Sequence, residues 1–379
     1  MMSRYHYVAI SVRKYALALI IVFMVIPGRG FANSADTSGV ASADSGAGSV
    51  GVAVFPIISY SLETRWVLGT MLYTNIIKPD TTERQRPSLF MPSVMYTQNK
   101  QLTLQLEFDH YWNRATRRIF GSVVLVKFPD RFYGIGNDLP DEYELFTPRS
   151  TLVNVNYQHG ITRNINIGGG FNFEKVEMVK VEPGGLLDTG SIPGADGGRI
   201  TGLSLLTTWD SRDHTNYPMD GFYLDLGLKQ FAKPLGSDFQ FAALELDTRY
   251  YLTLSASQVL AFQMQLRDIS GSAPFQYLST LGGYQSMRGY YTGRYRHNDK
   301  FIIQGEYRLS LPGKLGLVLF ACVGDVNSTL KNMMIRDFKY SYGLGIRYLL
   351  LPDSKSNLRV DFGYGKDTSG VNVGISEVF

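Results

Sequence analysis

The segment Leu281-Gly-Gly-Tyr-Gln-Ser-Met-Arg-Gly-Tyr290 is rich in glycine and carries a single arginine, Arg288, between a methionine and a glycine. It lies between two stretches, residues 260–267 and 301–310, in which apolar and polar side chains alternate. A period of two predicts β-strands with one apolar face and one polar face. We therefore expect the segment to be a loop between two strands, and we interpret it as the plug of a barrel.

Strands in which apolar and polar side chains alternate also occur in soluble β-sandwiches, where the apolar face points to the interior. In this chain every alternating stretch pairs a complete apolar row with a polar row, and no helices are expected that could cover the apolar rows. A closed barrel in a membrane accommodates both faces, because lipid surrounds it and water fills it. The fold prediction is an all-β, transmembrane antiparallel β-barrel with an external loop folded into the lumen.

The length fits about 16 strands, at roughly 20 residues for each strand and its connection. The expected strands are residues 52–60, 66–76, 88–97, 102–112, 118–128, 151–158, 164–173, 203–209, 222–228, 244–250, 260–267, 301–310, 315–323, 340–348, 358–364 and 371–375. After the first thirty-odd residues there is no run of about 18 apolar residues, which excludes a helical membrane protein.

The N-terminal region has the pattern of a targeting segment. Arg13 and Lys14 precede an apolar run, and Gly30 and Ala32 offer the small residues that a signal peptidase reads, with cleavage expected after Ala32. The alternative is a membrane anchor, but the run is short of the roughly 20 residues that span a bilayer. The composition that follows, mainly Ser, Ala, Gly and Asp, is typical of a flexible segment. The expected domains are a signal peptide over residues 1–32, a linker over 33–50 and the barrel over 51–379.

The lengths of the expected connections alternate. Outer-membrane barrels have short turns on the periplasmic side and long loops outside. With both termini in the periplasm, the four longest later connections all fall outside; they are residues 130–147, 179–198, 269–300 and 326–337. The turn over residues 78–87 is long for the periplasmic side, and the physical reason for its length is not evident from the sequence. This pattern predicts the bacterial outer membrane as the location.

Arg288 is the residue with the clearest chemistry. An arginine on a loop inside a lumen stays charged and needs carboxylate partners. Glu306 falls on the inward row of the next strand, with Arg308 beside it. A charge-assisted pair would pin the loop inside the barrel. The alternative is an external loop in solvent with an ordinary arginine.

Several motifs together resemble one family. Ser286-Met-Arg-Gly-Tyr290, Gly293-Arg-Tyr-Arg296 and Glu306-Tyr-Arg308 are similar to the signature of the bacterial surface antigen family, the barrel domain of the BamA/TamA outer-membrane assembly superfamily. Further pieces of the likeness are Arg131-Phe-Tyr-Gly-Ile-Gly-Asn137, the turn from Trp209 to Gly221, Leu358-Arg-Val-Asp-Phe-Gly363 and Phe379.

The resemblance implies a 16-stranded barrel whose sixth external loop is tucked inside. The motif Arg288, Gly289 and Tyr290 would hold that loop against an acidic barrel wall. The family also implies a poorly sealed lateral seam between the first and last strands, which some members use to insert or export proteins. Pro56 and Phe379 would mark this seam, and a proline in a strand indicates a weakly paired edge.

The chain departs from the family pattern in two ways. The strand after Glu-Tyr-Arg usually reads Phe-x-Asp-x-Gly, but here it reads Phe320-Ala-Cys-Val-Gly324. Because Cys322 cannot accept the charge of the loop arginine, Glu306 is expected to carry it alone or together with Asp325. Tandem periplasmic POTRA domains are not expected, since only residues 33–50 lie between the signal peptide and the barrel.

Enzyme chemistry is not indicated. The four histidines beyond the targeting segment, His110, His159, His214 and His297, are scattered, and we expect no metal and no cofactor. Cys322 is the only cysteine, so no intrachain disulfide is expected. The net charge of +4 is weak and gives no indication of nucleic-acid binding.

Two functions remain open. The first is a barrel that inserts, exports or displays protein or lipid, with outer-membrane lipid and a periplasmic soluble partner or client proteins as its contacts. The second is a passive or plugged pore for small solutes. An outer-membrane hydrolase is a third, weaker alternative, and the barrel is expected to be monomeric. The charged residues expected to line the lumen are Glu107, Asp109, Asp225, Lys229, Glu245, Asp247, Arg249, Arg267, Arg347, Arg359 and Asp361.

Overall fold

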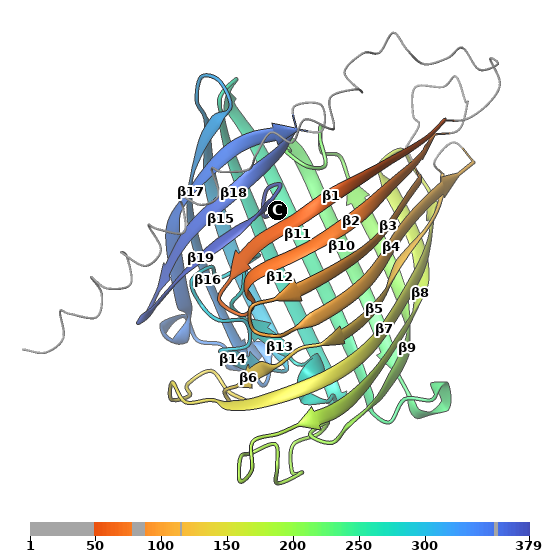
Figure 1. Ribbon diagram of the computed structural model, residues 1–379, viewed down its shortest axis with the longest axis vertical. Coiled ribbons are helices and arrows are strands. Elements are labelled where there is room, and N and C mark those ends of the chain that lie inside the picture. The colour runs from red at the N-terminus through yellow and green to blue at the C-terminus, as the bar shows by residue number, and fades with distance from the viewer. Residues whose placement is uncertain (1–48, 78–87, 114–115, 352–354) are drawn as a thin grey trace, which may run out of the picture. The chain divides into compact units, whose positions relative to one another are not determined.

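The computed structural model describes residues 49–77, 88–113, 116–351 and 355–379, which form a closed antiparallel β-barrel (Figure 1). The expected signal peptide, nearly all of the expected linker and the turn over residues 78–87 lie outside the described residues. Within the described part, no helix has the length and apolar character needed to cross a membrane. The wall of the barrel is built from β-strands, as the alternating sequence predicts.

Sixteen long strands form the wall in the described residues, each hydrogen-bonded to the next, and the first and last strands close the barrel. They are β1 Ser49–Ser61, β2 Arg65–Ile77, β3 Ser88–Thr97, β4 Leu102–Trp112, β5 Arg117–Lys127, β7 Glu144–Gly160, β8 Ile165–Lys180, β9 Gly197–Asp210, β10 Gly221–Phe231, β11 Gln240–Ser255, β12 Gln258–Ser272, β15 Asp299–Ser310, β16 Leu315–Asn327, β17 Lys339–Leu351, β18 Ser356–Gly365 and β19 Thr368–Ile375. The short elements are β6 Asp130–Phe132, η1 Lys233–Leu235, η2 Phe275–Tyr277, β13 Ser279–Leu281, β14 Tyr295–His297, η3 Leu330–Asn332 and η4 Ile335–Asp337. The predicted strand number of 16 is confirmed.

Several strands are longer than the alternating pattern predicts. The expected loop over residues 130–147 contains β6 and the start of β7, and β8 and β9 both extend into the expected loop over residues 179–198. Backbone hydrogen bonds continue between neighbouring strands where the side chains no longer alternate, because every backbone amide and carbonyl needs a partner. Hydrophobic periodicity marks only the part of a strand that has two different surroundings.

The two faces of the wall differ as predicted. In β16, Leu319 is 59% exposed and Val323 is 42% exposed, whereas Phe320 and Cys322 are each 4% exposed. Successive side chains of a strand point to opposite faces. The exposed row is the apolar, lipid-facing surface, and the buried row faces the interior of the barrel.

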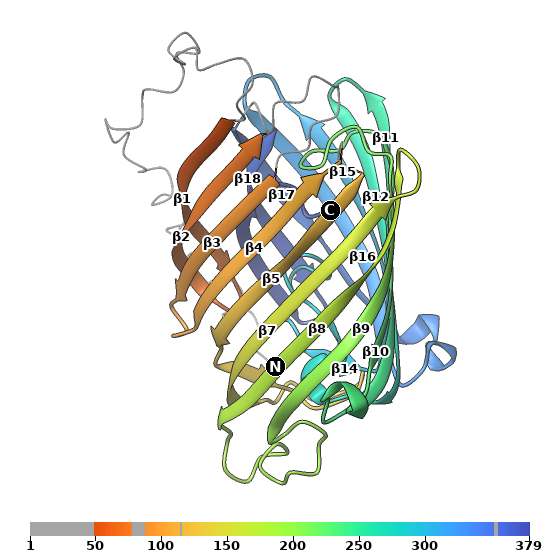
Figure 2. The same cartoon turned by 90° about the vertical axis from the view of Figure 1, so that its right-hand side faces the viewer.

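The connections follow the expected alternation. Because consecutive strands run in opposite directions, the connections after β5, β8, β12 and β16 all lie at one end of the barrel (Figure 2). We call this end the long-loop rim. The other end carries the turns over residues 161–164, 211–220, 256–257 and 311–314, and we call it the short-turn rim.

An aromatic cluster fills part of the interior near the long-loop rim. Phe231 and Phe241 stack with ring centroids 4.4 Å apart, and Tyr277 packs on both rings at 4.9 Å. Phe275 packs edge-to-face on Phe132 with centroids 5.0 Å apart. The cluster therefore holds the start of the β12–β15 connection against the inner face of β10 and β11.

The seam between β1 and β19 is short. Among the described residues the two strands share one register pair, Tyr60 with Val373. This register places Ile58 opposite Ile375, the last residue of β19, so the part of β1 before Ile58 has no β19 neighbour. Pro56 lies in this unpaired part, where a missing backbone donor on a strand edge is tolerated.

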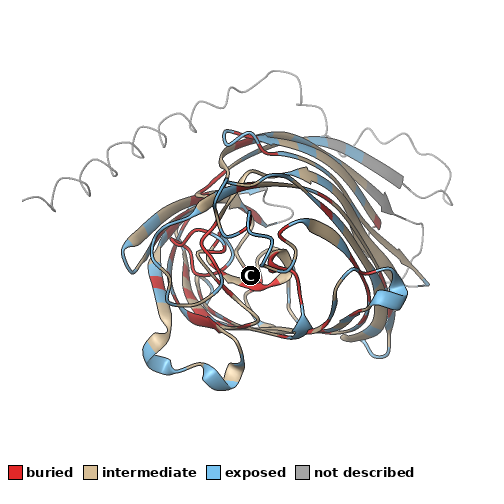
Figure 3. Ribbon diagram, turned by 90° about the horizontal axis from the view of Figure 1, so that it is seen from below, coloured by how far each residue is buried: buried red, intermediate tan, exposed pale blue. Residues whose placement is uncertain are grey.

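Phe379 does not lie at the seam, which corrects the sequence-based prediction. After Ile375 the chain turns into the barrel at Ser376, whose φ is 66°, and the C-terminal end lies near the centre of the barrel when it is viewed along its axis (Figure 3). Phe379 is 4% exposed and packs with Tyr251 of β11 and Ala261 of β12, far around the wall from β1. From the sequence alone, a terminal aromatic residue suggests the end of a wall strand. Here the ring of Phe379 packs inside the barrel instead.

Candidate functional site: the Arg288 loop and its carboxylate wall

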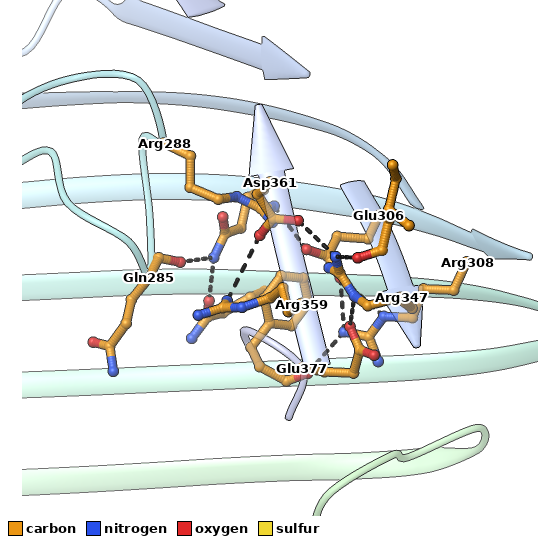
Figure 4. A network of polar contacts seen from close by, with 12 residues as sticks. Gln285, Arg288, Glu306, Arg308, Arg347, Arg359, Asp361 and Glu377 are labelled. Carbon is orange, nitrogen blue, oxygen red and sulfur yellow. Dashed lines mark hydrogen bonds and ion pairs between the residues drawn. The ribbon is translucent and has the colours of Figure 1, made fainter. Parts of the chain in front are cut away.

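Arg288 lies on residues 282–294, which we call the Arg288 loop, and its side chain is 1% exposed (Figure 4). Its Nη2 donates to Glu306 Oε1 of β15 at 2.7 Å, and its Nη1 donates to Asp361 Oδ2 of β18 at 2.9 Å. The guanidinium also lies 3.5 Å from the centroid of the Phe320 ring of β16. A planar guanidinium suits this setting, because it can bridge two carboxylates and stack on a ring at the same time.

The two carboxylates continue into a wider network. Glu306 Oε2 accepts from Arg308 Nε at 2.9 Å, and Asp361 Oδ1 accepts from Arg347 Nη1 at 2.6 Å. Arg347 Nε then donates to Glu377 Oε2 at 2.8 Å. Each buried charge thus has an opposite charge in contact, which is the condition for keeping ions away from water.

The strand register explains why these side chains meet. Glu306 of β15 is opposite Phe320, which is opposite Gly343 of β17, which is opposite Gly363 of β18. A Cβ added to Gly345 would lie 2.2 Å from Asp361 Oδ1. The glycines of β17 therefore leave enough space for the Asp361 side chain to reach the arginines.

Residues after Arg288 are held by the turn between β18 and β19. The hydroxyl of Tyr290 donates to the Tyr340 carbonyl at 3.1 Å and accepts from the Lys366 amide at 2.9 Å. The Thr368 hydroxyl donates to the Gly289 carbonyl at 2.7 Å. The Arg-Gly-Tyr motif is therefore in contact with the last hairpin of the barrel.

The following residues contact the first hairpin. Glu63, in the turn between β1 and β2, accepts from the Thr292 amide at 2.6 Å and from its hydroxyl at 2.8 Å. Tyr291 donates to Asp130 Oδ1 at 2.7 Å, and burial together with this carboxylate raises the pKa of Tyr291, so the phenol remains a donor. The Arg288 loop thus touches both strand pairs that meet at the seam, β1–β2 and β18–β19.

The segment Arg131–Asn137 also packs beside this loop. The Gly136 amide donates to the Arg296 carbonyl at 2.7 Å, and the Arg296 amide donates to the Gly136 carbonyl at 3.3 Å. Burial lowers the pKa of Arg296 to about 10, and its Nη1 donates to the Phe275 carbonyl at 2.7 Å. Two motifs that are separated in the sequence are therefore paired in space.

The predicted site residues are brought together only in part. Arg288, Glu306 and Arg308 are in one network, but Asp325 is not a partner of Arg288. Asp325 accepts from Asn137 Nδ2 at 3.3 Å and lies 3.7 Å from Lys339 Nζ. Asp361 takes the second place beside Arg288, which corrects the sequence-based choice. The signal for Asp361 was its place beside Arg359 in the motif of residues 358–363.

Cys322 occupies the position where the family pattern has aspartate. Its side chain is buried and its sulfur contacts Met287 of the Arg288 loop. The thiol therefore packs beneath the loop and contributes no charge to the network.

Among the described residues, no group of three or more His, Cys, Asp or Glu side chains could hold a metal ion. His110 stacks on Trp112 with ring centroids 5.6 Å apart, as expected for an interfacial aromatic pair.

Comparison with known proteins gives a consistent result. A family model described as the Omp85 superfamily domain matches residues 85–379. No curated protein matches the chain by sequence.

Solved structures share the barrel. BamA from Haemophilus ducreyi lacking POTRA domains 1–3 has a TM-score of 0.58 at 14% identity, over 87% of this chain and 70% of that one. CdiB from Acinetobacter baumannii has a TM-score of 0.53 at 12% identity, over 87% of this chain and 65% of that one. CdiB from Escherichia coli has a TM-score of 0.57 at 9% identity, over 86% of this chain and 67% of that one. At these identities the likeness is one of fold.

Proposed function

Because this chain belongs to the Omp85 superfamily and is an outer-membrane barrel like BamA and CdiB, we propose that it inserts, exports or displays protein or lipid at the outer membrane through the seam between β1 and β19. Its contacts would be outer-membrane lipid and either client polypeptides or a periplasmic soluble protein. The action would be non-catalytic, and the barrel would work as a monomer.

One observation carries this proposal. β1 and β19 share the single pair Tyr60–Val373, while β18 and β19 are paired from Leu358–Ile375 to Gly365–Thr368. An unpaired strand edge presents free backbone donors and acceptors that can pair with another chain. The stretch of β1 before Ile58 is such an edge, and it lies in the half of the seam nearer the short-turn rim.

The Arg288 loop would act as a latch for the other half of the seam. Thr292 is bonded to Glu63 on the first hairpin, and Gly289 is bonded to Thr368 on the last. Arg288 fixes the position of this bridge through Glu306 and Asp361. Docking of the loop inside the barrel would then keep the seam closed at the long-loop rim, and its release would let the strands part.

An engineered disulfide tests the use of the seam. Tyr60→Cys and Val373→Cys are placed in a Cys322→Ser background, since these two positions face each other in register. In a strain whose only copy is this variant, the oxidised protein should fail to support the outer-membrane protein and lipid composition of the wild-type strain. Reduction of the disulfide should restore that composition.

The control disulfide joins Ile346→Cys to Val360→Cys, which face each other on the continuous pair β17–β18. It adds a covalent link of the same kind and leaves the seam free. Equal loss of function from both disulfides, or none from the seam disulfide, would contradict the proposal.

A pore for small solutes is the second candidate, and a luminal cavity favours it. The cavity has a volume of about 770 Å³ and is lined by several of the predicted lumen charges, including Asp225, Lys229 and Glu245. Lys229 and Arg267 both pair with Glu245, at 2.6 and 3.1 Å. Planar-bilayer recording decides between the two: steady channels in wild-type protein, unchanged by the closed seam disulfide, would favour the pore.

A further inference from the structure

The connection between β16 and β17, residues 328–338, carries uncovered apolar side chains at the long-loop rim, and we call it the outward loop. Figures 2 and 3 both show it standing outside the ring of strands instead of covering the mouth of the barrel. At its tip Met334 is 49% exposed and Ile335 is 90% exposed, the highest value among the large apolar side chains that the structure describes. Adjacent apolar side chains on a projecting tip favour a contact that covers them.

The base of the outward loop is held by hydrogen bonds. The Leu330 amide donates to Asp299 Oδ2 of β15 at 2.7 Å, and Asn327 Nδ2 donates to the Asn332 carbonyl at 3.2 Å. The short turns η3 and η4 then lead the chain through the tip and back to the wall. The apolar tip therefore projects from an ordered base.

The outward loop rejoins the wall on its lipid-facing side. Phe338 packs on Phe301 with ring centroids 6.2 Å apart, and Phe301 shares the outward row of β15 with Ile303, which is 43% exposed. Directly after the loop, Tyr340 and Tyr342 of β17 are 47% and 55% exposed and stack with their centroids 6.5 Å apart. Exposed tyrosines near the end of a membrane barrel lie at the boundary between lipid chains and headgroups. The tip thus continues the lipid-facing surface at the level of the headgroups.

The charges of the outward loop suit an anionic membrane surface. Lys331 and Arg336 are exposed on either side of the tip, and Arg336 Nε lies 3.7 Å from Asp337 Oδ1. Two cations and one carboxylate give residues 328–338 a formal net charge of +1. Basic residues beside apolar ones are typical of segments that lie in the membrane interface. A second copy of this chain would present the same positive charge, so lipid is the better match for the tip.

From the exposed tip, its continuity with the lipid-facing row and its basic flanks, we propose that the outward loop anchors the long-loop rim in the outer leaflet of the membrane. Met334 and Ile335 insert among the upper parts of the lipid chains, and Lys331 and Arg336 lie at the phosphates of the headgroups. The anchor fixes the height of this rim in the membrane and does not depend on whether the seam opens.

Electron paramagnetic resonance of a spin label at Ile335→Cys, in a Cys322→Ser background, tests the contact in vesicles of phosphatidylethanolamine and phosphatidylglycerol. Oxygen concentrates in lipid and a nickel chelate stays in water, so the ratio of their collision rates reports the depth of the label. We expect this ratio to be several-fold higher at position 335 than at Leu186→Cys, which is 57% exposed in the connection between β8 and β9. Equal, water-like ratios at the two positions would overturn the proposal.

A label at Met334→Cys leaves Ile335 in place and tests its role. Adding Ile335→Asp should lower the ratio at position 334 to the value of the Leu186→Cys label, because a carboxylate is excluded from lipid chains. The matched control is Thr329→Asp, which adds the same charge at an exposed position near the base of the loop and should leave the depth unchanged. The proposal also fails if Ile335→Asp leaves the label at its original depth.

The contribution of the two cations is measured with the same label at Met334→Cys. Lys331→Gln/Arg336→Gln should move the label toward water in vesicles that contain phosphatidylglycerol. Folding of each variant is verified by its heat-dependent gel mobility. Spectral broadening that grows with the ratio of protein to lipid would show that a second copy of the chain covers the tip, which would contradict the lipid contact.

Discussion

The sulfur of Cys322 in β16 lies 3.2 Å from the sulfur of Met287 in the Arg288 loop. Both side chains are buried, at 4% and 0% exposure, so the loop covers the only thiol of the chain. The reactivity of this native cysteine therefore reports whether the loop is docked against the wall.

Arg288→Ala should release the loop. The substitution removes the partner that Glu306 and Asp361 share, although Glu306 keeps Arg308 and Asp361 keeps Arg347. Loss of one partner from such a buried network costs at most about 3 kcal/mol. We expect Cys322 to react with a maleimide in the folded variant but not in folded wild-type protein. Altered heat-dependent gel mobility should accompany the labelling.

The companion variants separate the two candidate carboxylates. Asp361→Asn should increase labelling of Cys322, because Asp361 bonds to Arg288. Asp325→Asn should leave labelling near the wild-type level, because Asp325 contacts Asn137 and Lys339. If Asp325→Asn increased the labelling of Cys322 and Asp361→Asn did not, Asp325 would be the carboxylate that holds Arg288.

Gly363→Ala should also displace the loop, through sterics. A Cβ at Gly363 would lie 2.4 Å from the Arg288 carbonyl oxygen, and one at Gly289 would lie 2.8 Å from the Gly363 carbonyl carbon. Overpacking of this kind costs about 1–3 kcal/mol. We expect a lower temperature of the gel-mobility transition and faster protease cleavage in the loop.

Gly227→Ala is the control for that substitution. Its nearest neighbour to an added Cβ is 3.6 Å away, so the methyl group fits. If both alanine variants had wild-type transition temperatures, the close approach of the loop to β18 would not determine whether the loop docks.

The edge of β1 should be visible in hydrogen exchange. Amides between Val52 and Ile57 that point toward the missing β19 neighbour should exchange much faster than amides of β10, which is paired on both sides. Mass spectrometry of peptides from the two strands measures the difference. Uniform protection along β1 would show that the seam is closed over its full length.

The turn over residues 211–220 should loosen in acid. Neutral His214 accepts at Nδ1 from the amides of Asn216 and Tyr217, at 3.1 and 3.2 Å. Burial, followed by the nearby Lys355 cation, lowers the pKa of His214, so the neutral form is favoured in the folded turn. Its stabilisation is complete above the unfolded value of about 6.5 and is lost as the pH falls below that value.

Hydrogen exchange of the turn at about pH 7.5 and pH 5.5, corrected for intrinsic rates, checks this expectation. His214→Asn should remove the pH dependence, because an asparagine oxygen can accept the same backbone amides and does not titrate. A pH response that survives in His214→Asn would point to another group.

The wall of the barrel could be predicted from sequence because its cause is local. The alternation of Leu319 with Phe320 reflects two different surroundings on either side of one strand, and this contrast is written into neighbouring residues. The number of strands and the side of the long loops follow from counting such stretches. Strand ends were less predictable, since backbone pairing continues where the contrast ends.

Contacts within the lumen depend on register across strands. Glu306 could be placed near Arg288 because it lies on the strand that follows the loop, but Asp361 comes from three strands further around the wall. Asp325 is closer in sequence and points instead to Asn137. The inward course of Phe379 depends on a pocket formed by Tyr251 and Ala261, which no local pattern reveals.

The buried end of the chain limits how the protein can be handled. The Arg308 guanidinium donates to the Phe379 carbonyl at 2.8 Å inside the barrel, so an affinity tag joined there would have to crowd the lumen or extract the tail. Either outcome would disturb Glu377 and its contact with Arg347. A tag inserted at Gly184, whose added Cβ would meet nothing within 4 Å, would instead project from the long-loop rim and leave the interior intact.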